Sequence, residues 1–199
     1  MTTEQIEIIY VDDRIDLQLT DYLNKYVGDC NKKSNNIVIG YNEVEFKQDY
    51  TYDSLINNET FRRCDIAIID SKLYENTNAK GHAYTGEDFK LLVRNLSPYI
   101  DIIVITQNEV SENSATIRKS HGNEDSKKHY DSELKPLLDY SIKCCTEYKF
   151  KLDELKTKGQ TDKAILDRIS DLINHEDTYN LTEKDVDEII KLFNEIKGE

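Results

Sequence analysis

Residues 7–16, EIIYVDDRID, run from an apolar segment directly into two adjacent aspartates and an arginine. The apolar part, IEIIYV at 6–11, is short and rich in isoleucine, which is typical of a strand buried on both faces. Two further segments share this pattern, DIAIID at 65–70 and IDIIVIT at 100–106. The three segments end on Asp12, Asp70 and Thr106 or just before them.

Helical patterns alternate with these strands. Residues 17–27 and 86–96 carry apolar side chains at helical spacing, a second helix is expected within 52–63, and residues 36–46 can form another strand. Strands that alternate with helices favour a parallel sheet covered by helices. The sequence therefore predicts an α/β fold with an open, parallel, five-stranded sheet and flanking helices.

Composition limits the function classes. A chain of 199 residues with 38% hydrophobic content can bury one substantial core and a small appendage. The net charge of −13, without a local basic patch, disfavours binding to nucleic acid or to anionic membranes. No signal peptide or spanning segment is recognisable, so we expect a soluble, cytoplasmic protein with reduced cysteines. The scattered histidines and cysteines make a zinc site improbable.

Four polar side chains are expected at one edge of the sheet, because the carboxyl ends of parallel strands meet there. They are Asp12, Asp13, Asp70 and Thr106. Two like charges about 4 Å apart repel by roughly 4 kcal/mol at a partly buried site. A divalent cation would remove this repulsion, and Mg²⁺ is the natural candidate because it prefers oxygen ligands.

These residues resemble the receiver domain of bacterial response regulators, over roughly residues 5–145. IIYVDDR is similar to the first strand of that family with its acidic pair, and DIAIIDSKL is similar to its third strand with the phosphoacceptor aspartate. GEDFKLLVRN resembles the start of its third helix, and IIVIT resembles its fourth strand with a terminal hydroxyl. The resemblance implies a receiver-like (flavodoxin-like) fold.

The resemblance also implies roles for individual residues. Asp70 would be the nucleophile that takes a phosphoryl group from a phosphohistidine or a small phosphodonor. Asp13, Asp70 and the main-chain carbonyl of Lys72 would hold Mg²⁺ directly, and Asp12 would help through water. Thr106 would hydrogen-bond the bound phosphoryl group. We expect at most self-phosphorylation of this kind, and no classical enzyme activity.

The family also uses a lysine at the end of its fifth strand, and two lysines compete for this role. SATIRKS at 114–120 forms a credible short strand that leads to Lys119, but it leaves little room for the preceding helix. DSKKHYD at 125–131 places Lys128 at a family-like distance from Thr106, but it is too polar for a buried strand. We favour Lys119 and keep Lys128 as the alternative.

Other features depart from the family. The loop at 71–85 is long and could be a lid or a partner-binding surface; it carries Tyr74, His82 and Tyr84. Gln107 follows Thr106 where the family prefers a small residue. No aromatic residue stands just before either lysine, and the fourth helix looks short or absent.

The C-terminal part is predicted to be a helical extension. A helix is expected from Ser132 to Gly159, with two more at about 161–174 and 183–197, the last capped by Thr182 and Asp185. We therefore divide the chain into a receiver-like domain at 1–145 and a helical extension at 146–199. Residues 146–199 have a net charge of −5, which disfavours a DNA-binding output domain.

Two main hypotheses follow from the sequence. The first is a signalling module with Asp70 as phosphoacceptor, which receives its signal from a histidine kinase or phosphotransfer protein and contacts a protein effector through the helical tail. The second is a phosphorylation-independent pseudo-receiver that serves as an adaptor subunit in a larger complex. Amphipathic tail helices also allow oligomers. A metal-dependent hydrolase is a weaker third hypothesis, because no histidine is placed as its base.

Overall fold

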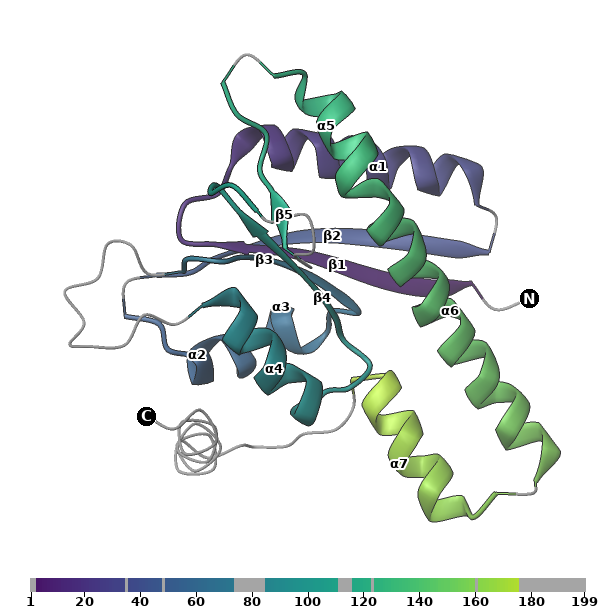
Figure 1. Ribbon diagram of the computed structural model, residues 1–199. Helices are drawn as coiled ribbons and strands as arrows, with labels where there is room; N and C mark the ends of the chain where they lie inside the picture. Colours follow the sequence, from purple (N-terminus) through teal and green to yellow (C-terminus); the bar gives the residue numbers. More distant parts are fainter. Residues whose placement is uncertain are drawn as a thin grey trace.

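The computed structural model describes residues 3–34, 36–47, 49–73, 85–110, 116–122, 124–159 and 161–175. They form an open sheet of five parallel strands in the order β2-β1-β3-β4-β5, covered by helices on both faces (Figure 1). The strands are β1 (Glu4–Asp12), β2 (Ile37–Glu45), β3 (Ile66–Asp70), β4 (Asp101–Thr106) and β5 (Ile117–Arg118). The predicted α/β class and the five-stranded parallel sheet are confirmed.

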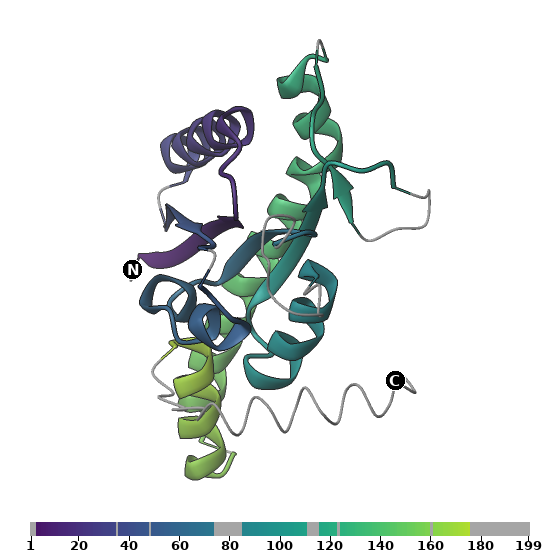
Figure 2. The same cartoon turned by 90° about the vertical axis from the view of Figure 1, so that its left-hand side faces the viewer.

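The helices fall into two layers. They are α1 (Leu17–Lys33), α2 (Tyr52–Ile56), α3 (Glu59–Arg62), α4 (Gly86–Leu96), α5 (Ser126–Glu133), α6 (Lys135–Lys158) and α7 (Lys163–Ile173). Figures 1 and 2 both show α1 and α5 above the sheet and α2, α3 and α4 below it. The strand order and the two helical layers are those of a flavodoxin-like sheet.

The alternation of side chains along β1 builds two cores. Ile6, Ile8 and Tyr10 pack with the buried face of α1, whereas Ile9 and Val11 pack with the core on the α4 side. A strand in the middle of a parallel sheet is buried on both faces, which explains why this segment is continuously apolar. Because alternate residues share a face, the side chain of Asp12 follows that of Tyr10 on the α1 side of the sheet.

Two helical regions differ from the sequence prediction. The helix expected within 52–63 is divided into α2 and α3, because the side chain of Asn58 accepts hydrogen bonds from the next turn and starts a new helix. The helix expected from Ser132 begins earlier as α5, capped by Asp125, and starts again as α6. Pro136 lies in the first turn of α6, where its missing N–H is tolerated.

The C-terminal extension packs against its own sheet as far as it is described. The proposed boundary between residues 145 and 146 falls inside α6, and Lys149 on this helix donates a hydrogen bond to the carbonyl of Gln5 (2.6 Å). α7 returns beside α6, and His175 just beyond it contacts Asp65. The helix predicted at 183–197, with its Thr182 and Asp185 cap, lies outside the described residues. Within the described ranges, no helix is long and apolar enough to cross a membrane.

Candidate functional site

The strand register brings the predicted acidic residues to one edge. Val11 of β1 pairs with Ile69 of β3, so the residues that follow them, Asp12 and Asp70, both reach the carboxyl edge. Asp70 pairs in turn with Ile105 of β4, and Thr106 follows at the same edge. Asp12 and Asp70 are buried there, and Asp13 is half-buried. One carboxylate oxygen from each of the three lies within 4.8 Å of the others, the only such cluster found among the residues that the structure describes.

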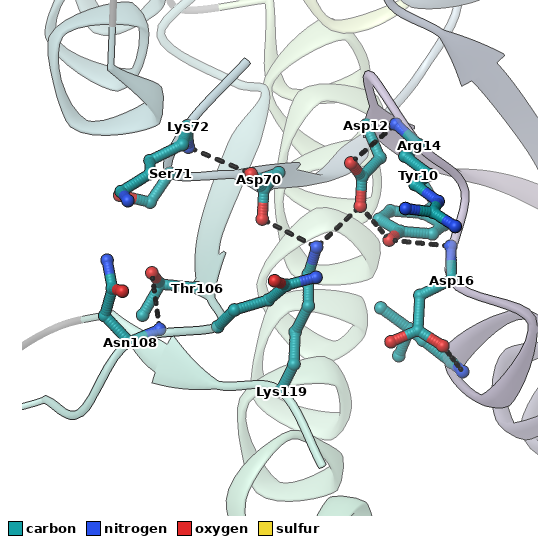
Figure 3. A network of polar contacts seen from close by, with 12 residues as sticks. Tyr10, Asp12, Arg14, Asp16, Asp70, Ser71, Lys72, Thr106, Asn108 and Lys119 are labelled. Atoms are coloured by element: carbon teal, nitrogen blue, oxygen red, sulfur yellow. Dashed lines mark hydrogen bonds and ion pairs between the residues drawn. The ribbon is translucent and has the colours of Figure 1, made fainter. Parts of the chain in front are cut away.

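Lys119 lies between two of these carboxylates (Figure 3). It directly follows β5, and its main-chain N–H donates to the carbonyl of Thr106 (2.6 Å). Its ammonium group forms ion pairs with Asp12 Oδ2 (2.6 Å) and Asp70 Oδ1 (2.7 Å), and its side chain is only 2% exposed. The lysine favoured from the sequence therefore lies in the acidic cluster.

Lys128, the alternative lysine, lies elsewhere. It belongs to α5, its side chain is 86% exposed, and its nearest charged partner is Asp125 at 3.9 Å. Residues 126–133 form α5, so Lys128 stands on a helix and not on the buried strand that would carry it to the acidic edge.

The charges at this edge are not balanced. Burial and the neighbouring Asp12 raise the pKa of Asp13 to about 6, because its carboxylate form has too few favourable partners. Burial also raises the pKa of Asp70, although Lys119 opposes the rise. Burial alone would lower the pKa of Lys119, but Asp70 and Asp12 outweigh it and raise the pKa. The ammonium group therefore stays charged, while the three carboxyl groups keep an excess of negative charge.

Two further predicted site residues lie at the same edge. The main-chain N–H of Lys72 donates to Asp70 Oδ2 (2.9 Å), so the turn after β3 is tied to the carboxylate. Thr106 ends β4, and its hydroxyl accepts a hydrogen bond from the N–H of Asn108 (3.2 Å). The metal-binding role of the Lys72 carbonyl and the phosphoryl-binding role of Thr106 stay predictions.

Sequence reasoning missed Tyr10. This fully buried side chain donates a hydrogen bond from its hydroxyl group to Asp12 Oδ2, and it accepts one from the N–H of Asp16 (3.3 Å). Burial, followed by the charge of Asp12, raises the pKa of Tyr10, so the phenol remains a donor. The signal in the sequence was the two-residue spacing in YVD, which places a phenol and a carboxylate on one face of a strand.

Gly86 allows a helix to approach Asp70 closely. It is the first residue of α4, and a Cβ atom at this position would lie 2.7 Å from the main-chain carbonyl oxygen of Asp70. The side chain of Thr85 caps the helix by accepting a hydrogen bond from the N–H of Asp88 (3.1 Å). The glycine that was recognised as part of a helix start therefore also sets the distance between α4 and the acidic edge.

A polar brace connects β5 to α5. Arg118 donates two hydrogen bonds to Glu124, each 3.0 Å long, and the ring of His129 bonds to the carbonyl of Arg118 (2.7 Å). Because β5 contains only two residues, these contacts help to hold the chain that carries Lys119. Sequence reasoning did not find this brace, because its partners lie on both sides of a loop.

Several predicted features cannot be placed. Tyr74, His82 and Tyr84 lie outside the described residues, as does the segment 111–115. The fourth helix, expected to be short or absent, would follow β4, and none of the described residues 107–110 is helical. Gln107 uses its main-chain carbonyl to accept a bond from the ring of His121 (2.6 Å).

Comparison with known proteins adds no family assignment. No protein-family model matches the chain, and no curated protein matches it significantly. The architecture is compatible with a receiver-like fold, since the sheet is parallel, has the strand order 2-1-3-4-5 and carries helices on both faces.

Proposed function

We propose that this protein is a receiver-like signalling module in which Asp70 accepts a phosphoryl group in the presence of Mg²⁺. The observation that carries the proposal is the convergence of Asp12, Asp13 and Asp70 around the buried ammonium group of Lys119. Three carboxylates and one ammonium group leave negative charge at this edge. A hard divalent cation neutralises such a group through oxygen ligands.

The residues present fit a magnesium ion. Asp13, Asp70 and the carbonyl of Lys72 would hold it, with Asp12 assisting through water, and the raised pKa of Asp13 indicates a carboxyl group that lacks a counter-charge. When bound, the ion supplies positive charge to the phosphoryl oxygens. Lys119 supplies a second positive charge beside Asp70 Oδ1.

The chemical step is a direct transfer. A carboxylate oxygen of Asp70 attacks the phosphorus atom, and an acyl phosphate bond forms. The phosphorus–nitrogen bond of a phosphohistidine, or the phosphorus–oxygen bond of a small acyl phosphate, breaks at the same centre. The electron pair leaves with the imidazole or with the carboxylate of the donor. Lys119 remains charged and compensates the negative charge on the transferred group.

The partners that we propose follow from this chemistry. A histidine kinase or phosphotransfer protein would supply the phosphoryl group, and a protein effector would read the result through the helical tail. The exposed aromatic side chains on α6 support a protein partner; they are Tyr140, Tyr148 and Phe150. Such side chains are common anchors in protein interfaces.

A phosphorylation-independent adaptor is the second candidate. The observation that favours it is that Asp12 already receives hydrogen bonds on both oxygens from within the protein, and Lys119 already pairs with Asp70. In this case the acidic edge would be a structural feature, and the fold would serve only to bind a partner.

Intact-protein mass spectrometry separates the two candidates. The full chain is treated with acetyl phosphate or phosphoramidate and Mg²⁺. Two variants are treated in the same way: Asp70→Asn, and Asp29→Asn, which changes a half-exposed aspartate on α1. We expect one added phosphoryl group in wild type and Asp29→Asn, and none in Asp70→Asn. No adduct under conditions that label a known receiver domain would favour the adaptor.

A further inference from the structure

Tyr10 forms one end of a polar chain that reaches Asp70. Its hydroxyl group contacts the N–H of Asp16 on one side and Asp12 Oδ2 on the other, and the same Asp12 oxygen accepts a bond from Lys119 (2.6 Å) (Figure 3). Lys119 then pairs with Asp70 Oδ1 (2.7 Å). The phenol is thus connected to the proposed phosphoacceptor through two charged side chains.

The carboxylate of Asp12 is held on both oxygens. Oδ2 receives Tyr10 and Lys119, and Oδ1 receives the main-chain N–H of Arg14 (3.0 Å). Without Tyr10, Oδ2 would keep only the ammonium group of Lys119, which stands on a flexible stem, whereas the phenol is held by the core. Tyr10 is therefore the rigid side-chain donor that sets the position of Oδ2.

The orientation of Asp12 matters because Lys119 is a flexible side chain. A lysine ammonium group stands on a four-carbon stem, and its position is set by the acceptors that it meets. Here those acceptors are Asp12 and Asp70, within a site where Lys119 is only 2% exposed. If Asp12 turns, the ammonium group loses one of its two fixed acceptors.

We propose that Tyr10 is a positioning residue for phosphoryl transfer at Asp70: its hydroxyl group orients Asp12 so that Lys119 is held against Asp70 Oδ1. This inference rests on the proposed function. Tyr10 touches neither the metal ligands Asp13 and Asp70 nor the expected path of the phosphorus. It acts through Asp12 and Lys119.

The packing of Tyr10 supports this role. Its ring lies in the core between β1 and α1, among Leu19, Leu23 and Ile8, so it cannot move away from Asp12 without disturbing the core. Asp16, whose N–H binds the phenol, is the N-cap of α1. The phenol is thus fixed by the fold at both its ring and its hydroxyl group.

The test uses Tyr10→Phe with a matched control. Tyr26 is another buried tyrosine on the α1 side of the sheet, and its hydroxyl donates to Asp139 (2.7 Å), far along the chain from the acidic edge. Tyr26→Phe removes a phenol–carboxylate bond of the same kind, although this one is only partly buried. For wild type and both variants, we measure Mg²⁺ affinity by calorimetry and the rate of phosphorylation by acetyl phosphate at saturating Mg²⁺.

The expected result is a divergence between the two measurements. In Tyr10→Phe the phosphorylation rate should fall about tenfold, as for the loss of one charge-assisted hydrogen bond that positions the reacting groups. Its Mg²⁺ affinity should stay within about twofold of wild type, because the direct ligands Asp13 and Asp70 are unchanged and Asp12 assists only through water. Tyr26→Phe should match wild type in both. A purely structural defect would weaken both properties of Tyr10→Phe together.

Three results would overturn the inference. The first is an unchanged phosphorylation rate in Tyr10→Phe, and the second is an equal loss in Tyr10→Phe and Tyr26→Phe. The third is a joint loss of rate and Mg²⁺ affinity in Tyr10→Phe. Absence of labelling in wild type is a separate outcome: it would overturn the proposed function, and the positioning role of Tyr10 with it.

Discussion

Asp65 and Asp70 stand at opposite ends of β3, and both are buried, with 4% and 6% exposure. At the amino edge, Asp65 meets Lys149 (3.1 Å), His175 (3.4 Å) and the N–H of Glu7 (2.8 Å). Although burial alone would raise the pKa of Asp65, these partners lower it. At the carboxyl edge, Asp70 shares one lysine with Asp12, and its pKa is raised.

The comparison shows that two equally buried carboxylates can differ in the number of counter-charges that surround them. Asp65 has basic partners on α6 and just beyond α7, and these hold the extension to the sheet. Around Asp70 there are more carboxylates than cations among the described residues. The carboxylate at the amino edge has its counter-charges within the fold, whereas the carboxyl edge keeps a repulsion that the proposed cation would relieve.

The largest expected effect on stability comes from replacing Asp65 and Asp70, each in a separate variant, by asparagine. Asp65→Asn leaves Lys149 without its buried partner, so the free energy of unfolding should fall by about 2 kcal/mol. Asp70→Asn removes one of three repelling carboxylates and should stay within about 1 kcal/mol of wild type or exceed it. Urea denaturation followed by circular dichroism measures both. Equal destabilisation of the two variants would break the comparison.

A smaller effect should follow from Gly86→Ala, which tests how closely α4 packs on the carboxyl edge. The added Cβ would meet the carbonyl oxygen of Asp70 at 2.7 Å, so the helix or the strand end must move. We expect a loss of about 1.5 kcal/mol.

Gly28→Ala is the matched control for this change. Gly28 lies within α1 and has no atom within 4 Å of its expected Cβ, so alanine should stabilise the helix by about 0.5–1 kcal/mol. Denaturation of both variants gives the comparison, and a stabilising effect of Gly86→Ala would show that α4 does not press on Asp70.

The smallest predicted effect is a pH dependence of the carboxyl edge. The pKa of Asp13 is raised from its ordinary 3.8 to about 6. The contribution of the Asp13 carboxyl group to the free energy of unfolding is therefore fully present below pH 3.8, and it is lost as the pH rises through about 6.

Without Mg²⁺, Asp13→Asn should thus be more stable than wild type by about 1 kcal/mol at neutral pH, after allowance for screening of a partly exposed group. The difference should shrink toward about pH 4. Denaturation of both proteins in EDTA across this range measures it. A constant difference would show that Asp13 does not carry the excess charge.

The acidic edge could be predicted because its parts are local. Each apolar strand and its terminal aspartate lie in one short segment, and a parallel sheet brings such ends together. Lys119 could be favoured because it follows alternating apolar residues. The partners of Asp65 could not be predicted, since Lys149 and His175 reach it only through the packing of α6 and α7. The role of Tyr10 could not be predicted, because an aromatic residue in a buried strand is expected to be a core residue.

Titration calorimetry with Mg²⁺ measures whether the carboxyl edge takes up the positive charge that its three carboxylates lack. Wild type should bind one Mg²⁺ ion at a saturable site, and Asp13→Asn should bind it at least about tenfold more weakly. Lys128→Ala, which changes an exposed lysine outside the site, should bind as wild type does. Equal and negligible binding by wild type and Asp13→Asn would contradict the account.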